Sequence, residues 1–155
     1  MITQKAKYAI KALVALARAE ADRPSSIRDI AAREQIPQSF LEQILIELRR
    51  AGLVESRRGK EGGYLLAAPP EEIGLGRILR LIDGPVAPLP CLSRTAYRRC
   101  ADCVDEASCT VRAIFSEMYE TTVAVLDRTT LMDALESASI PPHATGEAPD
   151  DELST

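Results

Sequence analysis

The sequence predicts a mainly α-helical fold with one small β-hairpin. Three observations favour this class: apolar residues recur at helical spacing in several segments, a Gly-rich turn separates two short strand-like runs, and the core must be aliphatic. The last point follows from composition, because the 155 residues include no Trp, four Tyr and two Phe. A chain of this length corresponds to one domain, or to one domain with an added helical arm.

Three helices are predicted in the amino-terminal part. The first covers residues 4–19, and the second covers residues 27–35 after a capping-box pattern of Ser26 and Asp29. The third covers residues 38–50, whose apolar stripe consists of Leu41, Ile44, Leu45 and Leu48. The second and third helices are separated only by a short turn, which is typical of a helix-turn-helix.

The opposite face of residues 38–50 is polar and is a candidate DNA-reading surface. Its side chains can address base edges and phosphates. They are Gln38, Ser39, Glu42, Gln43 and Arg49, and Arg28 of the preceding helix is a further candidate contact. A solvated polar face, which any surface helix has, is the alternative interpretation.

The next segment favours DNA binding over that alternative. Residues 53–57 and 63–67 are predicted strands of a hairpin whose tip, RGKEGG, is rich in Gly and cations. The candidate DNA contacts that project from it are Arg57, Arg58, Gly59 and Lys60. A basic hairpin directly after a recognition helix predicts a winged helix-turn-helix domain over residues 1–84, with the helix in the major groove and the wing on phosphates or the minor groove.

Charge is distributed unevenly along the chain. Residues 1–69 carry 12 Lys and Arg against 8 Asp and Glu, whereas the rest of the chain is acidic, and the formal net charge is −4. A basic amino-terminal half suits a polyanionic partner such as DNA.

Helices are also predicted after the wing. Residues 73–84 form an amphipathic helix closed by Gly84, and a long helix follows Cys109 within a predicted dimerisation segment, residues 110–138. Its apolar stripe consists of Val111, Ile114, Phe115, Met118, Thr122 and Val125. A helix this long finds its partner most simply in a second copy of the chain, so we expect a homodimer on a palindromic operator in double-stranded DNA.

The end of the chain contains a short helix and a polar segment. Thr130 and Asp133 have the pattern of a helix cap for residues 130–137. Residues 139–155 are acidic and contain Pro, and we expect them to be disordered.

All four cysteines lie in the predicted Pro-rich connector and sensor loop, residues 85–109. They are Cys91, Cys100, Cys103 and Cys109. Thiolates are the ligands that iron–sulfur clusters and zinc both prefer. Structural zinc usually uses two close pairs, and only Cys100 and Cys103 are close here, so an iron–sulfur cluster is favoured over zinc. A thiol–disulfide switch needs no metal and is the other alternative. Four inert core cysteines fit poorly, because the region is polar and is expected to be exposed.

The charges around Cys100 are mixed. Positive charge from Arg94, Arg98 and Arg99 favours the thiolate, whereas the acidic residues Asp102, Asp105 and Glu106 oppose it.

The sequence predicts a cytoplasmic protein. Lys7, Lys11 and Arg18 interrupt the amino-terminal apolar run, so it does not read as a secretion signal, and no segment is long and apolar enough for a membrane span. Thiols stay reduced in the cytosol, which favours metal binding or redox sensing over structural disulfides.

Several segments together resemble the Rrf-two family of winged-helix regulators, typified by IscR, NsrR and RirA. They are KAKYAIKALVALA, SFLEQILIELRRAGLVESRRG, GGYLLA, IGLGRILRLIDG and the cysteine loop, and the resemblance covers residues 1 to about 135. It implies a homodimeric transcription factor with a domain-swapped long helix, whose DNA affinity responds to an iron–sulfur cluster. Ser39, Glu42 and Gln43 match positions that read bases, and Arg58 and Gly59 match the wing tip. Ser39 and Glu42 also match a capping box, which is a structural alternative for Glu42.

The chain departs from the family at the expected cluster ligands. Cys91, Cys103 and Cys109 match the three family cysteines, but the fourth ligand of the IscR type, a His, is replaced by Arg112. Other members use an acidic side chain near Tyr8, which this chain lacks. We therefore hypothesise that Cys100 completes an all-cysteine site for a two-iron or four-iron cluster (2Fe–2S or 4Fe–4S), with a thiol-only sensor as the alternative.

Two classes of function follow. The favoured class is a transcriptional regulator controlled by a cluster, with repression preferred to activation. The alternative is a cluster carrier or small redox protein that binds no DNA. The sequence contains no constellation of His, Ser and Asp for hydrolytic catalysis, and its one His, His143, falls in the acidic tail, so we expect no enzymatic activity.

Overall fold

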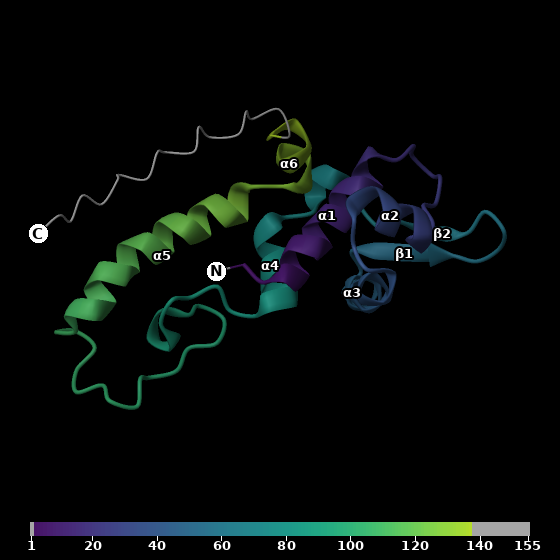
Figure 1. The fold of residues 1–155 in the computed structure, drawn as a ribbon. Helices are drawn as coiled ribbons and strands as arrows, with labels where there is room; N and C mark the ends of the chain where they lie inside the picture. Colours follow the sequence, from purple (N-terminus) through teal and green to yellow (C-terminus); the bar gives the residue numbers. More distant parts are fainter. Residues whose placement is uncertain (1, 138–155) are drawn as a thin grey trace, which may run out of the picture.

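A computed structural model describes residues 2–137, which are mostly helical with one two-stranded antiparallel hairpin (Figure 1). In chain order the elements are α1 (Gln4–Arg18), α2 (Ile27–Glu34), α3 (Gln38–Arg50), β1 (Val54–Arg57), β2 (Gly63–Leu66), the 3-10 helix η1 (Pro70–Glu72), α4 (Leu75–Asp83), the 3-10 helix η2 (Pro90–Leu92), α5 (Thr110–Arg128) and α6 (Leu131–Ser137). The predicted fold class is confirmed. The predicted acidic tail, 139–155, lies outside the described residues.

The turn between α2 and α3 is tight. The Ser26 hydroxyl accepts the Asp29 N–H at 3.1 Å and caps the start of α2. At the other end of α2, Gln35 adopts the left-handed conformation with φ 55°, which turns the chain sharply. Ile36 then enters the core and is only 4% exposed, and α3 begins after Pro37. These two helices form the predicted helix-turn-helix.

The core beneath these helices is aliphatic, as the composition requires. Its largest fully buried side chains are Leu13, Leu41, Ile44, Leu45, Leu48, Leu53, Val54, Ile73, Ile78 and Leu131. Leu131 belongs to α6, which follows the long helix α5 in sequence. The chain therefore leaves the amino-terminal domain, forms α5, and returns to bury α6 against α1.

The hairpin of β1 and β2 is fixed to the start of the helix-turn-helix. Ser25 and Tyr64 exchange backbone hydrogen bonds, both 2.8 Å long. Gly63 has φ 153°, and a Cβ at this position would lie 2.3 Å from the Ser25 carbonyl oxygen. The close approach of the two backbones therefore requires glycine at position 63.

The helix predicted to begin at residue 73 begins two residues later, at Leu75. The reason is that Ile73 and Gly74 pair with the chain that follows α5. The Leu131 N–H donates to the Ile73 carbonyl at 2.8 Å, and the Leu75 N–H donates to the Thr129 carbonyl at the same distance. Extended backbone at these positions thus ties α4 to α6.

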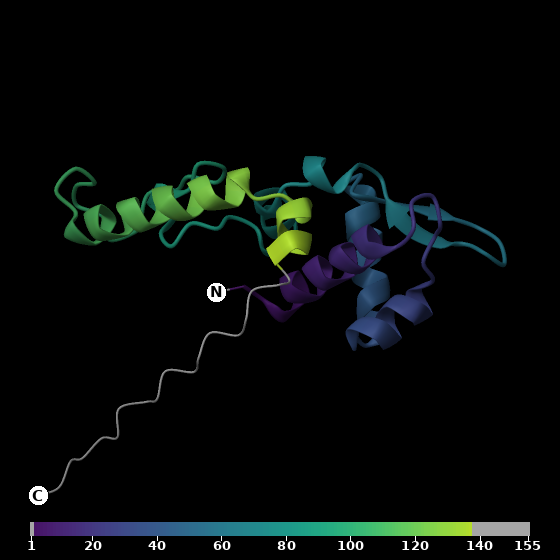
Figure 2. The same ribbon diagram turned by 90° about the horizontal axis from the view of Figure 1, so that it is seen from above.

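α5 extends away from the winged domain, as two perpendicular views show (Figures 1 and 2). η2 packs against α5, and the chain from residue 93 to residue 109 leads to its amino-terminal end. Near the other end, Arg80 of α4 forms an ion pair with Asp127 at 2.7 Å. Gly76 permits this contact, since a Cβ there would lie 2.8 Å from the Asp127 carboxylate.

Among the described residues, no helix is both long and apolar enough to cross a membrane.

We predict that the stability of the α5–α6 junction depends on pH through Asp133. The Asp133 carboxylate accepts the Thr130 N–H at 2.7 Å and its hydroxyl at 3.0 Å, and these bonds hold the pKa of Asp133 below its usual range. A lowered pKa stabilises the folded state above the unfolded-state pKa, and this contribution is lost as pH falls through the folded-state pKa. D133N mimics the protonated group. Denaturant titrations are expected to show D133N less stable than the wild type at neutral pH, with the difference shrinking in acid. A pH-independent difference would contradict this role.

Candidate DNA-binding surface and cysteine cavity

α3 presents the predicted polar face to solvent. Its exposed members are Gln38, Ser39, Gln43 and Arg49. Glu42 is half-buried and accepts a hydrogen bond from the Gln38 side chain at 3.4 Å. A capping box between Ser39 and Glu42 is not formed, because Pro37 is the residue before the first turn and no side chain caps α3. The capping interpretation of Glu42 is therefore wrong.

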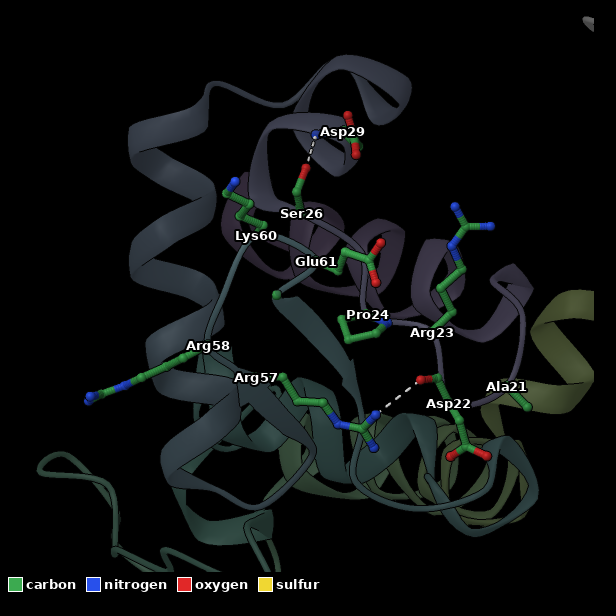
Figure 3. A pocket seen from close by; sticks show the side chains of 11 residues that line it. Ala21, Asp22, Arg23, Pro24, Ser26, Asp29, Arg57, Arg58, Lys60 and Glu61 are labelled. Atoms are coloured by element: carbon green, nitrogen blue, oxygen red, sulfur yellow. Dashed lines mark hydrogen bonds between the residues drawn. The ribbon is translucent and has the colours of Figure 1, made fainter.

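The wing exposes Arg58, Gly59 and Lys60 at its tip. Gly59 has φ 114°, a conformation that L residues rarely adopt, so the tight tip depends on glycine. Figure 3 shows Arg58 pointing away from the domain, whereas Arg57 turns back toward Asp22. The Arg57 guanidinium donates to the Asp22 carbonyl at 3.1 Å. The Arg57 side chain remains 49% exposed, and this backbone acceptor directs it toward the α1–α2 loop.

A cavity of about 710 Å³ lies between the wing and the loop that precedes α2 (Figure 3). Its lining combines cations and carboxylates, which are Arg23, Arg57, Arg58 and Lys60 and Asp22, Asp29 and Glu61. Because the charges largely cancel, the cavity itself is a weak candidate for an anion site. Arg28 is exposed on α2. The exposed positive charge of the wing is therefore concentrated at its tip.

All four cysteines line one cavity of about 370 Å³ beside the amino-terminal end of α5. Cys91 is buried, at 6% exposed, and lies in η2. Cys100, Cys103 and Cys109 are half-buried. The prediction that this region is exposed is wrong for Cys91, because η2 packs against α5. Residues separated by up to eighteen positions are thus brought to the same space.

The loop around this cavity is held mainly by its own polar groups. The Arg99 guanidinium donates to the carbonyls of Cys103, at 3.3 Å, and of Val104, at 3.1 Å. The Tyr97 hydroxyl donates to the Glu106 carboxylate, and this bond raises the pKa of Tyr97. The Arg99 guanidinium therefore binds backbone carbonyls and does not act as a counter-charge for a thiolate.

The pKa of the Cys100 thiol is raised, first by burial and then by a hydrogen bond with Cys91. The negative charge of Asp102 acts in the same direction. Of the opposing charges predicted around Cys100, the negative charge of Asp102 is the one that acts on the pKa of this thiol. Arg94 pairs with Glu120 instead, and Arg99 contacts carbonyl groups. Without a metal, Cys100 is held as a neutral thiol at neutral pH.

Two contacts join the cysteine loop to α5. The Arg94 backbone N–H donates to the Tyr119 hydroxyl at 3.2 Å, and the Arg94 guanidinium forms an ion pair with Glu120. Tyr119 is 6% exposed. At the start of α5, the Cys109 sulfur accepts the Arg112 N–H at 3.4 Å and thereby caps the helix. The contact between Arg94 and Tyr119 could not be predicted from the sequence, because nothing in their spacing indicates that they meet.

The cysteine cavity matches a soft-metal site in chemistry but is not arranged as one. Within residues 2–137, no three His, Cys, Asp or Glu side chains are already gathered around one point to hold a metal ion. The donor set nevertheless fits an iron–sulfur cluster or zinc, because four sulfurs share one cavity with the side chain of Arg112, whose buried Nε has no hydrogen-bond partner among the described residues. A cation of this kind favours an anionic occupant.

The apolar stripe of α5 divides into two faces. Tyr119 and Val123 are buried against the rest of the chain, at 6% and 2% exposed. The other face is largely solvent-exposed and consists of Val111, Ile114, Met118, Thr122 and Val125. Of these, Ile114 is 60% exposed and Met118 is 58% exposed. Such a continuous row of exposed apolar side chains is typical of a helix with an additional partner.

A helix-turn-helix followed by a cationic wing is a domain suited to DNA, and it places the chain in the class of winged-helix transcriptional regulators. Comparison with known proteins makes this assignment specific. The model of the Rrf2 family, described as an iron-dependent transcriptional regulator, matches residues 2–137. The chain belongs to this family, and the Rrf-two resemblance is confirmed.

Individual relatives agree with this assignment. An rrf2-like HTH-type transcriptional regulator of Rhodobacter capsulatus is 50% identical over 138 residues, which cover 87% of this chain and 92% of the relative. CymR, the global cysteine regulator of B. subtilis, has a similar structure, with a TM-score of 0.73 and 32% identity over 88% of this chain and 96% of that one. IscR of T. potens has a TM-score of 0.70 and 29% identity, covering 94% and 93% of the two chains. Since the relatives are named as regulators, the chain is a transcriptional regulator and not an enzyme.

Proposed function

We propose that the chain is a homodimeric repressor whose affinity for a palindromic operator is controlled by an iron–sulfur cluster in the cysteine cavity. The observation that carries this proposal is that all four cysteines line a single cavity at the base of α5. The cavity adjoins both the loop that leaves the DNA-binding domain and the helix with an unpartnered apolar face. Binding or loss of a cluster in the cavity can therefore affect both DNA binding and the dimer.

DNA is contacted by the polar face of α3 and by the wing tip. Gln43 and Ser39 are exposed on α3 and suit base edges, while Arg49 and Arg28 suit phosphates. Arg58 and Lys60 contact the backbone or the minor groove, and the chain at Gly59 approaches DNA closely. Arg57 contributes mainly by bracing the wing against Asp22. Gln38 and Glu42, which contact each other, form the edge of the recognition surface.

Cys91, Cys100, Cys103 and Cys109 hold the cluster. When bound, the cluster supplies a centre whose charge and integrity respond to reductants and oxidants. The route from this site to DNA runs through contacts of the chain itself. Arg94 joins the loop to Tyr119 and Glu120 of α5, and Asp127 near the far end of α5 joins Arg80 of α4 in the winged domain.

A second candidate is a metal-free thiol switch, favoured by the shared cavity that both Cys91 and Cys100 line. In this alternative, the two thiols lose two protons and two electrons to a peroxide, which is reduced to water, and a Cys91–Cys100 disulfide forms. The raised pKa of Cys100 counts against it, because the thiolate is the species that reacts with the oxidant. A structural zinc site with the same four ligands is a further outcome of the metal analysis described below.

The DNA contacts are tested by R58A and Q43A, measured by fluorescence anisotropy on a duplex selected from a random pool. R58A is expected to weaken binding to all sequences and to lower the salt slope by about one, because it removes one phosphate contact. Q43A is expected to lose about 1–3 kcal/mol of discrimination at one base pair. R57A is the matched control, with a smaller effect on the salt slope than R58A. Equal losses on every sequence from R58A and Q43A would contradict the assigned roles.

The dimer is tested by placing a charge on the exposed apolar face of α5. I114D is expected to convert a dimer to a monomer in sedimentation velocity, because the carboxylate would be buried without a partner. A124D adds the same charge on the exposed polar side of α5 and is expected to stay dimeric. A dimeric I114D, or a monomeric wild-type protein, would refute this interface.

The cluster is tested by anaerobic reconstitution with ferrous iron and sulfide, followed by absorption spectroscopy and metal analysis. The wild type is expected to be brown with iron and sulfide, and C100S is expected to lose most of the iron because one ligand is missing. A101S places a serine beside Cys100 and is expected to retain the full cluster. A colourless wild-type protein with stoichiometric zinc supports the zinc site. A metal-free protein that forms a Cys91–Cys100 disulfide with peroxide supports the thiol switch. Either result refutes the iron–sulfur cluster.

A further inference from the structure

Arg112 has a buried hydrogen-bond donor that nothing in the described chain satisfies. Its Nε is buried without a hydrogen-bond partner, and none of the ion pairs within residues 2–137 involves Arg112. The side chain lines the cavity that the four cysteines share. A buried N–H without an acceptor destabilises a protein, so this orphaned Nε–H is a donor that a bound acceptor in the cavity would satisfy.

The position of Arg112 on α5 is defined by the fold. It lies in the first turn, at helical spacing from Tyr119 and Val123, which are the buried residues of α5. All three therefore lie on the face that turns toward the rest of the chain. The Arg112 backbone N–H donates to the Cys109 sulfur at 3.4 Å. Arg112 is thus held next to one sulfur while its side chain reaches along the cavity wall.

Two of the three carboxylates that share the cavity are engaged elsewhere. Asp105 accepts the N–H groups of Ala107 and Ser108, and Glu106 accepts the Tyr97 hydroxyl. Asp102 is exposed, and its negative charge acts on Cys100. The positive charge of Arg112 is therefore left for whatever fills the cavity. Neutral thiols are weak acceptors and leave the guanidinium uncompensated.

We propose that Arg112 is the positioning and charge-compensating residue for a thiolate-bound metal centre in the cysteine cavity. Four thiolates carry more negative charge than an iron–sulfur core or a zinc ion neutralises, so the occupied site is anionic. The Arg112 Nε–H donates to a ligand sulfur and stabilises this charge. The inference rests on the proposed cluster function and adds that Arg112, on the first turn of α5, links the charge of the centre to the helix.

Charge compensation by Arg112 predicts the direction in which the reduction potential of the centre changes. Reduction adds an electron to an already anionic centre, and a nearby cation stabilises the reduced form. Removing the cation therefore lowers the reduction potential. Hydrogen-bonding partners of metal ligands also contribute about ten- to a hundredfold to metal affinity, so their loss accelerates release of the metal.

The test uses full-length protein reconstituted anaerobically with ferrous iron and sulfide, as R112Q, R112K and R98Q. R112Q is expected to show a lower reduction potential and about tenfold faster iron loss to a chelator. R112K retains the charge and is expected to restore the potential. R98Q removes a charge from the same loop, but its exposed side chain is absent from the cavity lining, so it is expected to match the wild type. Circular dichroism of the metal-free proteins shows whether each variant is folded.

The possible outcomes separate the two proposals. If the wild type takes up no cluster, the proposed function fails, and the role of Arg112 toward a cluster fails with it. If the wild type holds a cluster and folded R112Q matches it in potential and iron retention, only the role of Arg112 is refuted. Equal changes in R112Q and R98Q would also refute it, since they would reflect the net charge of the loop. If R112Q does not fold, R112K is the variant that tests the role of Arg112. Because R112K keeps the positive charge, a reduction potential below that of the wild type would refute charge compensation.

Discussion

The attachment of α5 to the winged domain is the constraint on which the rest of the structure depends. Leu131 is buried in the same core as Ile73, and backbone hydrogen bonds at 2.8 Å join residues 73 and 75 to residues 129 and 131. The Arg80–Asp127 ion pair adds a contact between α4 and α5. Full burial of one aliphatic side chain contributes about 1.5–3 kcal/mol, so this end of α5 is firmly fixed. The wing and recognition helix are therefore held in a defined relation to the long helix.

The other end of α5 is held much more weakly. Exposed contacts such as the Arg94–Glu120 pair stabilise a structure by about 0–1 kcal/mol, and single hydrogen bonds contribute about 0.5–1.5 kcal/mol. The cysteine loop depends on contacts of this kind, apart from the buried residues Cys91 and Ser93. A helix fixed at one end and lightly held at the other suits a sensor. At the firmly held end, the ion pair between Asp127 and Arg80 joins α5 to α4.

Much of the fold follows from local sequence, because helix stripes, Ser26, Gly84 and the Gly-rich wing act within a few residues. What sequence reasoning missed depends on contacts between distant segments. The start of α4 shifts because Ile73 pairs with Leu131, and Arg57 turns inward because the Asp22 carbonyl lies nearby. For the candidate site, the sequence predicted the sulfur ligands but not the electrostatics around them. Spacing identified the four cysteines, but the raised pKa of Cys100 and the orphaned donor of Arg112 arise from burial, which only the folded chain defines.

The most direct test of cluster-controlled DNA binding compares one preparation before and after cluster removal. Anaerobic anisotropy titrations of the cluster-bound protein, and of the same protein after treatment with an iron chelator, are run on one selected duplex at one salt concentration. The account predicts dissociation constants that differ about fivefold or more, as expected for two coupled sites. Identical dissociation constants for the two forms, with the cluster verified in one and absent from the other, would contradict it.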